Sequence, residues 1–470
     1  MTAFKRLAGV LVVLAFVAAC GPTAQALRPT LPSRASHVPG TPVLPAVRSG
    51  GEESSPPDVE SPPAAGSFTP SALPSGSAPA SSSPAGSATP TGSATPPPPG
   101  IGEQITGFPA SDAFEVTSVV PIANGFLAVG FGGMPGQDYF GLRQGIVWTT
   151  TDGLTWQESS DPAFTDTTLT DVVTMGSDIY VVGYMSTCDF AINPDCVDAP
   201  SAGTVVYRSS NGGGWEQLQQ TADIQHATFD GVRASDNLLV AWGSAGDTNV
   251  TTTLWTSSDG LAWTPATDLA GMDPVYSATA GGPGVLAFGT SNDAQSDELS
   301  LIGATSSNGS QFTAATLPSV PNGEIDDICL GPAGYVGVGN FETDDVPDIA
   351  LALSSADGLT WTQSPSDDSF QNALMTEVHA AANEYVAVGS TFDPNDPTLE
   401  SQTLRAWASA DGHTWRSAGD VGGSFTQYGA SALGSNGLVI FTAYQPDIED
   451  DVDVTSTISA WLVPLDRLAP

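Results

Sequence analysis

Basic residues are scarce in this 470-residue sequence, and their scarcity restricts the partners that the protein can have. Lys and Arg together number 11, against 51 Asp and Glu, which gives a formal net charge of −40 at pH 7. After residue 100 there is no lysine, and six arginines stand against 47 acidic residues. Such a field repels nucleic acids, anionic lipids and polyanionic glycans, and it attracts cations. We therefore expect no nucleic-acid partner.

Long apolar runs are also missing. The N-terminal run Leu7–Ala19 follows Lys5 and Arg6 and is too short to span a bilayer comfortably, so it has the layout of a secretory signal. It ends in "VAAC" at Cys20, which resembles the lipobox of bacterial lipoproteins. The resemblance implies a signal peptide over residues 1–19, lipidation of Cys20, and a cell-envelope protein anchored on the outer side of the cytoplasmic membrane. An ordinary signal peptide with a chance cysteine is the alternative.

Residues 20–104 contain very few large apolar side chains. Between Ser61 and Gly100, every residue except Phe68 and Leu73 is Pro, Ala, Ser, Thr or Gly. Such a composition cannot bury enough apolar surface to offset the loss of chain entropy, so we expect a disordered tether. A flexible chain of roughly 80 residues spans on the order of 50 Å. The folded domain is then predicted to cover residues 105–470.

Cysteine is rare as well, with four residues in the chain. Cys188 and Cys196 lie eight residues apart in the polar segment "CDFAINPDC", which favours a small disulfide outside the cytoplasm. Cys329 lies in the apolar stretch "ICL", where a buried thiol is expected.

Helical periodicity is almost absent after residue 104, and a repeat takes its place. Near copies of the heptad "SSDGLAW" begin at Thr150, Ser209, Ser257, Ser306, Ser355 and Ser409. Each follows a β-rich run such as "YVAVG", and a seventh run, "GLVIFT", has no heptad after it. One unit contains four short alternating strands in about 50 residues, which is typical of propeller blades. The prediction is an all-β fold, a seven-bladed β-propeller of four-stranded antiparallel blades.

The seventh blade lacks an outer strand in this scheme. The segment Ile105–Asp112, "ITGFPASD", resembles the closing strand of the first blade, with Phe108 in the place of Trp156. We predict that this N-terminal strand completes the last blade and closes the ring, which removes two sheet edges.

The heptad is expected to form a tight turn between the third and fourth strands of a blade. Asp and Asn accept hydrogen bonds from turn amides, and the glycine supplies a positive φ. The motif resembles the Asp-box, or BNR repeat, of sialidases and related propellers, although Asp and Gly are adjacent here and the box is one residue shorter. The resemblance implies structural boxes on the face away from the ligand. The turn residues are Asp152, Asn211, Asp259, Asn308, Asp357 and Asp411.

The resemblance also implies that ligands bind near the axis, on the face that carries the long loops between second and third strands. The positions twelve residues before the glycine of each β-rich run include three acidic residues, which alternation directs toward the channel. The loops themselves are acidic, as in "FETDDVPD" and "PDIEDDVD". The predicted ligand-binding residues are Asp171, Asp230, Asp326, Asp327, Glu377, Asp344, Asp345, Asp450 and Asp451.

Two kinds of chemistry are open to these carboxylates. Asp326, Asp327 and Glu377 form a calcium candidate, since hard oxygen ligands suit that ion, although no loop matches a dedicated calcium motif. Asp327 and Glu377 are also the candidates for an acid–base pair in a glycoside hydrolase or lyase. The sialidase resemblance implies three arginines gripping a carboxylate, and the few arginines and the acidic field oppose such an anionic sugar.

The sequence thus favours a lipid-anchored, non-catalytic binding or scaffolding module that uses an acidic loop face. Its partner would be a protein or a neutral or cationic glycan, with no cofactor unless calcium binds. The alternative is a sialidase-like or other propeller glycoside hydrolase that uses a carboxylate pair.

Overall fold

The computed structural model of the protein describes most of the chain from Gly100 onward. The chain divides into two units, Met1–Arg28 with Pro99–Pro470, and Pro29–Pro98, and all described residues belong to the first. The described residues are 100–109, 113–133, 143–159, 161–185, 203–220, 224–235, 237–246, 251–282, 284–292, 299–342, 348–393, 402–425, 427–444 and 457–468.

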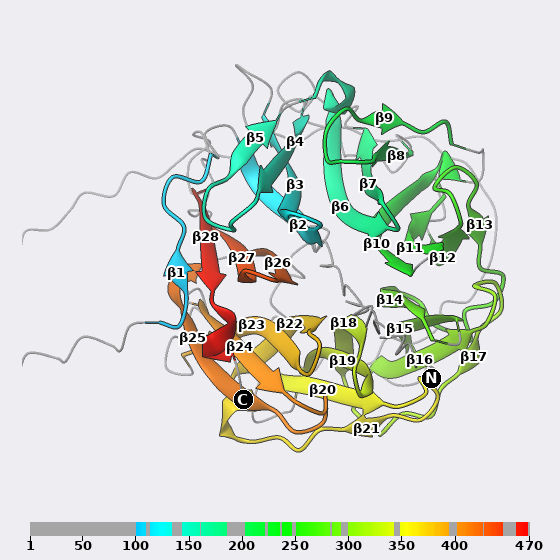
Figure 1. Ribbon diagram of the computed structural model, residues 1–470. Coiled ribbons are helices and arrows are strands. Elements are labelled where there is room, and N and C mark those ends of the chain that lie inside the picture. Colours follow the sequence, from blue (N-terminus) through cyan, green and yellow to red (C-terminus); the bar gives the residue numbers. More distant parts are fainter. Residues whose placement is uncertain are drawn as a thin grey trace, which may run out of the picture. The chain divides into compact units, whose positions relative to one another are not determined.

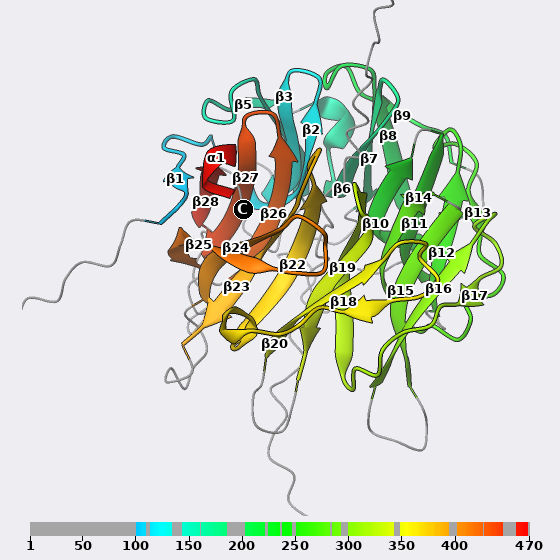
Figure 2. The same cartoon turned by 60° about the horizontal axis from the view of Figure 1, so that its bottom comes forward.

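The described strands form seven four-stranded antiparallel sheets around an axis, which confirms the predicted seven-bladed propeller (Figures 1 and 2). The inner strands of blades 1 to 7 are β2 (Ala113–Ile122), β6 (Thr167–Met175), β10 (Ala227–Ser235), β14 (Val275–Gly281), β18 (Gly323–Gly331), β22 (Ala373–Ala380) and β26 (Gln427–Gly434). The second strands are β3 (Gly125–Gly133), β7 (Asp178–Met185), β11 (Leu238–Ala245), β15 (Gly284–Asn292), β19 (Gly334–Phe341), β23 (Tyr385–Phe392) and β27 (Gly437–Tyr444).

The third strands are β4 (Arg143–Thr150), β8 (Thr204–Ser209), β12 (Thr251–Ser257), β16 (Leu299–Ser306), β20 (Ile349–Ser355), β24 (Gln402–Ser409) and β28 (Thr457–Val463). The outer strands are β5 (Gln157–Ser159), β9 (Glu216–Gln217), β13 (Thr264–Pro265), β17 (Thr313–Ala314), β21 (Thr362–Gln363), β25 (Arg416–Phe425) and β1 (Glu103–Gln104). One short α-helix, α1 (Leu465–Leu468), follows β28. No helix in the described part of the chain is long and apolar enough to cross a membrane.

The ring closes through the N-terminal strand, as predicted, but with different residues. β1 pairs with β28 through Gln104 opposite Trp461, and the Ile105 amide donates to the Ala460 carbonyl at 2.8 Å. The predicted strand Ile105–Asp112 was therefore placed too late. It contains Pro109, which has no N–H to donate to a ladder. Among the described residues, the first backbone hydrogen bond from this segment to a blade is at Ile101, whose amide donates to the Asp420 carbonyl.

Phe108 lies beyond this strand and fills the seam between blades 7 and 1. Its ring centroid is 5.1 Å from that of Phe441 and 5.8 Å from that of Trp156. The apolar core is built in the same way all around the ring, as seven clusters that each join two neighbouring blades. Cys329 is fully buried in one of them with a free thiol, as expected.

The six heptads form the turns between third and outer strands. In blade 3, Asp259 Oδ1 accepts the amides of Leu261 and Ala262 at 2.9 and 3.1 Å, and the Trp263 indole donates to the Gly260 carbonyl. Gly260 has a φ of +73°, a conformation that other residues adopt with strain. In each of the other five boxes, the equivalent side-chain oxygen accepts a turn amide in the same way. These acceptors are Asp152, Asn211, Asn308, Asp357 and Asp411.

Candidate functional site

Each of the seven inner strands carries a β-bulge at the same position. The extra residues are Thr117, Thr170, Asp230, Tyr276, Asp326, Thr376 and Gly429. A bulge interrupts the ladder and re-aims the side chain that follows it. The following residue is polar and buried in five blades, namely Ser118, Asp171, Ser277, Asp327 and Glu377. The inner strands, which surround the axis in Figure 1, therefore carry a layer of buried polar side chains.

Asp171 joins blades 1, 2 and 3. Its Oδ1 accepts hydrogen bonds from the Ser118 hydroxyl at 2.6 Å and from the Val172 amide at 2.8 Å. Its Oδ2 accepts the Val232 amide of the next blade, also at 2.8 Å. Both amides lie two residues after a bulge, where the ladder is interrupted. The carboxylate thus satisfies backbone donors and fastens adjacent blades together.

Asp327 and Glu377 repeat this arrangement in blades 5 and 6. Asp327 Oδ2 accepts the Val378 amide at 2.9 Å, and Glu377 Oε2 accepts the Ser431 amide at 2.8 Å. Glu377 Oε2 also accepts the hydroxyls of Ser431 and of Tyr428. The seams between blades 5 and 6 and between blades 6 and 7 are held by the same device as the seam between blades 2 and 3.

Arg233 links the two halves of this layer. It leaves β10 of blade 3, and its Nη1 donates to Asp171 Oδ2 at 3.2 Å while its Nη2 donates to Asp327 Oδ1 at 3.0 Å. Its side chain is 2% exposed, so both ion pairs are screened from water. We call Asp171, Arg233, Asp327, Glu377 and their hydrogen-bond partners Ser118, His379, Tyr428 and Ser431 the axial cluster.

Burial dominates the protonation of this cluster. It raises the pKa of Asp171 to about 6, although Arg233 and three hydrogen bonds oppose the shift. The pKa of Asp327 is raised for the same reason, again against Arg233. Burial and the neighbouring Asp327 raise the pKa of Glu377 well above its usual value. The axial cluster therefore contains one positive charge, on Arg233, beside the carboxyl groups of Asp171 and Asp327, and the third carboxyl group, Glu377, favours its neutral form.

His379, Ser431 and Glu377 lie in a row that differs from a nucleophilic triad. His379 Nε2 is 2.6 Å from Ser431 Oγ, and Ser431 in turn bonds to Glu377, so the serine occupies the middle position. In a triad the histidine lies between the nucleophile and the carboxylate. All three side chains are at most 1% exposed. This row connects blades 6 and 7 and offers no reactive group to a substrate.

The sequence prediction brought Asp171, Asp327 and Glu377 together near the axis, and the structure does so too. It places them inside the ring, at most 1% exposed, instead of around an open channel mouth. The reason is that the bulges direct these carboxylates onto backbone amides and Arg233. Asp230 and Asp326 occupy bulge positions and are partly buried, and burial raises the pKa of Asp230 to about 6.

The remaining predicted residues fall outside the described part of the chain. These are Asp344, Asp345, Asp450, Asp451, Cys20, Cys188 and Cys196. Calcium at Asp326, Asp327 and Glu377 stays a prediction. Within the described ranges, no three His, Cys, Asp or Glu side chains are grouped as metal ligands, and Asp327 is already paired with Arg233.

Sequence reasoning missed a second buried pair, Glu115 and Arg143 of blade 1. Arg143 Nη1 donates to Thr168 Oγ1 and to the Tyr184 hydroxyl, and its guanidinium lies 4.7 Å from the centroid of the Phe131 ring. Burial raises the pKa of Glu115 to about 7, partly opposed by Gln427 and Arg143. The available signal was an acidic residue inside the apolar inner strand "AFEVTSVV".

Comparisons with known proteins found distant similarities to solved structures. No protein-family model matches the chain, and no curated protein matches it. Trypanosoma rangeli sialidase is 13% identical over 76% of this chain and 55% of the sialidase, with a TM-score of 0.39. This chain thus spans about half the length of that enzyme.

Two further solved structures are similar at the same level. The polysaccharide lyase Uly1 is 10% identical over 75% of this chain and 90% of the lyase, with a TM-score of 0.44. Zg3597, a family 117 glycoside hydrolase produced by the marine bacterium Zobellia galactanivorans, is 12% identical over 65% of this chain and 88% of its own, with a TM-score of 0.33. These distant similarities bear on the fold alone.

Proposed function

We propose that the protein is a lipid-anchored, extracytoplasmic β-propeller that acts as a non-catalytic binding or scaffolding module. One observation carries the proposal. Asp327 and Glu377, the candidates for an acid–base pair, are 1% exposed, and each accepts a backbone amide from the next blade. A catalytic carboxyl group must lie within hydrogen-bond reach of the substrate. These two groups hold the ring together instead.

The arginines of the folded region support the same reading. A sialidase-like site needs three of them at one carboxylate. Here Arg233 lies in the axial cluster and Arg143 at the seam of blades 1 and 2. Of the other four, Arg208 pairs with Glu216 and Arg405 pairs with Asp420. Arg416 donates to the Leu468 carbonyl and Arg467 donates to the Ile101 carbonyl.

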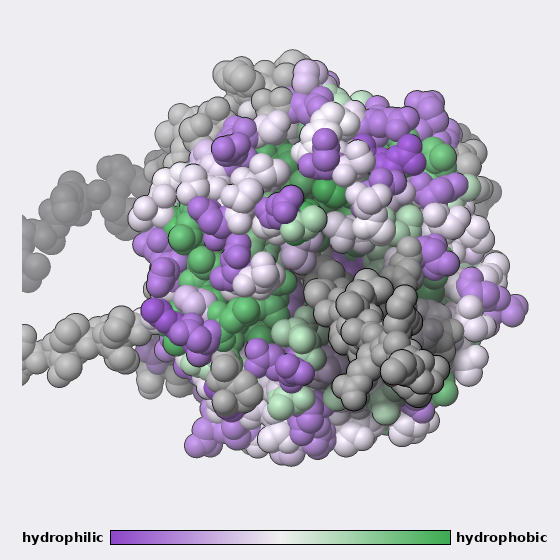
Figure 3. All heavy atoms as spheres, viewed as in Figure 1, coloured by the Kyte–Doolittle hydropathy of each residue, from purple (hydrophilic) through white to green (hydrophobic). Residues whose placement is uncertain are grey.

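The partner in this proposal is a protein or a neutral or cationic glycan that meets the acidic loops between second and third strands. Those loops carry Asp344, Asp345, Asp450 and Asp451, so the ligand face would be strongly negative. Figure 3 shows hydrophilic residues distributed over the face seen in Figure 1, with smaller apolar areas among them.

The proposed lipid anchor at Cys20 is tested by membrane fractionation. We expect the wild-type protein in the membrane fraction and the Cys20→Ala protein in the soluble fraction.

The decisive experiment is a turnover screen of the purified protein against neutral and anionic chromogenic glycosides. We expect no turnover above buffer. Turnover that is lost in both Asp327→Asn and Glu377→Gln, with the melting temperatures of both variants recorded to exclude unfolding, would overturn the proposal and establish the glycoside hydrolase alternative.

A further inference from the structure

A groove lies between blades 1 and 2 on the face of the heptad turns, opposite the loop face of the proposed function. It has two adjoining lobes with volumes of about 540 and 480 Å³. Both lobes are lined by Ile122, the last residue of β2, by Asn124 from the turn that follows it, and by Asn211 from the heptad of blade 2. Each volume falls within the range of about 300–1,000 Å³ that is typical of small-ligand sites.

Blade 2 borders this groove with an aliphatic residue at a position where blades 1, 5 and 6 carry an aromatic ring. Blades 3, 4 and 7 also have an aliphatic residue there, namely Leu239, Val285 and Leu438. At the start of the second strand, blades 5 and 6 carry Tyr335 and Tyr385, whose hydroxyls donate to carbonyls in the inner turn of the preceding blade, at 3.0 and 2.8 Å. Blade 1 has Phe126 at this position, and its ring packs against Gly434 of blade 7. A Cβ atom added at Gly434 would lie only 2.6 Å from the ring, so the ring fills the space between the two blades. The equivalent residue of blade 2 is Ile179.

The heptad of blade 2 opens the space further. Gly213 stands where blades 1, 3 and 5 have a leucine, and Asn211 stands where they have an aspartate. Asn211 Oδ1 accepts the Gly213 amide at 3.0 Å, so the side-chain oxygen is used within the turn. Among the described residues, the Asn211 Nδ2 group makes no hydrogen bond, and its two N–H donors are available to a ligand.

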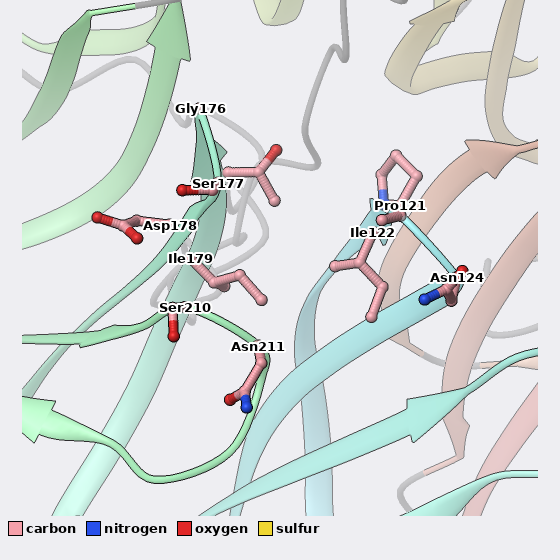
Figure 4. Close-up of a pocket in the computed structure, with 11 residues that line it drawn as sticks. Pro121, Ile122, Asn124, Gly176, Ser177, Asp178, Ile179, Ser210 and Asn211 are labelled. Atoms are coloured by element: carbon pink, nitrogen blue, oxygen red, sulfur yellow. The ribbon is translucent and has the colours of Figure 1, made fainter.

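The polar lining is almost entirely uncharged. Figure 4 shows Ile122 and Ile179 pointing toward one another from the two blades, with Asn124 and Asn211 on opposite sides of the gap. Asp178 is the one charged residue among the described lining residues, and its carboxylate points away from the gap. Further amide and hydroxyl groups continue along the second lobe, from Gln157, Thr149 and Thr155. Such a lining favours a neutral ligand that both donates and accepts hydrogen bonds.

The backbone beside the groove excludes the commonest way of binding an extended peptide. β4 is paired with β3 on one side and with β5 on the other at Thr149, so a bound chain cannot add to the edge of β4 there. The described lining offers a ligand side-chain amides and hydroxyls over an aliphatic floor. Neighbouring ring hydroxyls of a sugar match that pattern, and the C–H face of the ring fits Ile122 and Ile179.

We propose that this groove is a binding site for a neutral oligosaccharide, independent of the ligand at the loop face. The test is isothermal titration of the full chain with maltohexaose, cellohexaose and mannohexaose, and with hexagalacturonate as the anionic comparison. We expect at least one neutral hexasaccharide to bind with a Kd below about 1 mM and the anionic one to show no binding. Affinities in this range are usual for small polar ligands in open grooves.

Three variants locate the binding. Ile179→Tyr restores the ring found in blades 5 and 6 and should weaken binding at least tenfold. Asn211→Asp restores the common heptad residue, removes two donors and should weaken binding about fivefold. Asn308→Asp makes the same change in blade 4, away from the groove, and should leave the Kd unchanged.

Two results would overturn the inference. One is the absence of binding to all three neutral hexasaccharides. The other is binding that persists unchanged in a folded Ile179→Tyr protein, which would show that the sugar binds outside this groove and would remove this second site without testing the proposed function. Melting curves of each variant show whether it is folded, and Asn211→Asp serves if Ile179→Tyr is not.

Discussion

Arg233 shows how much one side chain can matter in a ring of separate sheets. Each carboxylate of the axial cluster fastens one blade to the next, whereas Arg233 joins blade 3 to Asp171 of blade 2 and to Asp327 of blade 5. A buried ion pair of this kind contributes little when compared with a well-packed apolar core, but the removal of one partner leaves a charge without compensation. The arginine is therefore required because the two aspartates are buried.

Replacement of Arg233 by methionine should lower the free energy of unfolding by about 3–5 kcal/mol at pH 7, since both aspartates lose their counter-charge. Urea denaturation followed by tryptophan fluorescence measures the loss. Arg233 lowers the pKa of Asp171, which is about 6 in the intact protein, so this pKa is higher in the variant. The deficit should therefore shrink as the pH falls from above 7 toward about 6, because Asp171 takes up a proton in the variant first.

The triple variant Asp171→Asn, Arg233→Met, Asp327→Asn provides the control for that experiment. It removes all three charges together and should recover much of the lost stability at pH 7. An Arg233→Met protein as stable as the wild type at every pH would show that the ion pairs do not hold the ring.

At the scale of the element, the repeat was readable because each blade has the same local requirements. A four-strand unit needs turns at fixed places, and Asp259 with Gly260 marks one of them. The regular spacing therefore gave the number of blades, the strand order and the closure of the ring. Alternation also identified Asp171, Asp327 and Glu377 as axial.

What could not be read from the sequence depends on contacts between elements. A bulge changes which of two consecutive residues faces the axis, so Asp326 and Asp327 receive different environments although both are aspartate. The reach of Arg233 from blade 3 to Asp327 of blade 5 is a contact that no local pattern reveals. The burial of Asp327 and Glu377 by neighbouring blades is likewise not visible in one strand.

The closing strand can be tested through Ile105, which lies next to β1 and is buried in the core between blades 7 and 1. Ile105→Asp places a carboxylate in that core and should lower the free energy of unfolding by several kcal/mol, because the buried charge has no partner. Thermal melting should show a clear decrease, and limited proteolysis should cut blade 7 first. Gln104→Ala, on the exposed strand itself, is the matched control and should change stability by less than about 0.5 kcal/mol.

At the scale of the whole molecule, the acidic residues fall into two groups that respond to pH in opposite directions. Turn amides lower the pKa of Asp152 to about 2, and they lower those of Asp259, Asp357 and Asp411 as well. Their stabilising effect is present above the ordinary aspartate pKa and is lost as the pH falls. Burial raises the pKa of Glu115 to about 7 and those of Asp171 and Asp230 to about 6.

For the buried group the dependence is reversed. In the unfolded chain these carboxyl groups ionise near pH 4, whereas in the folded protein they keep their protons to pH 6 or 7, so stability falls as the pH rises through that window. The net charge of −40 at pH 7 adds self-repulsion in the same direction. We therefore expect the free energy of unfolding to be largest at about pH 4–5 and to decline toward pH 7.

Glu115→Gln isolates one part of that decline, because glutamine keeps the shape of the side chain and has no charge to lose. At pH 4.5 the variant and the wild type should be nearly equal in stability. Above pH 7 the variant should be more stable by about 3 kcal/mol, which corresponds to the shift of the Glu115 pKa to about 7. Urea denaturation at constant ionic strength between pH 3 and 8 measures both curves. Parallel curves for the two proteins would mean that Glu115 is already ionised in the folded state and that Arg143, not burial, controls its charge.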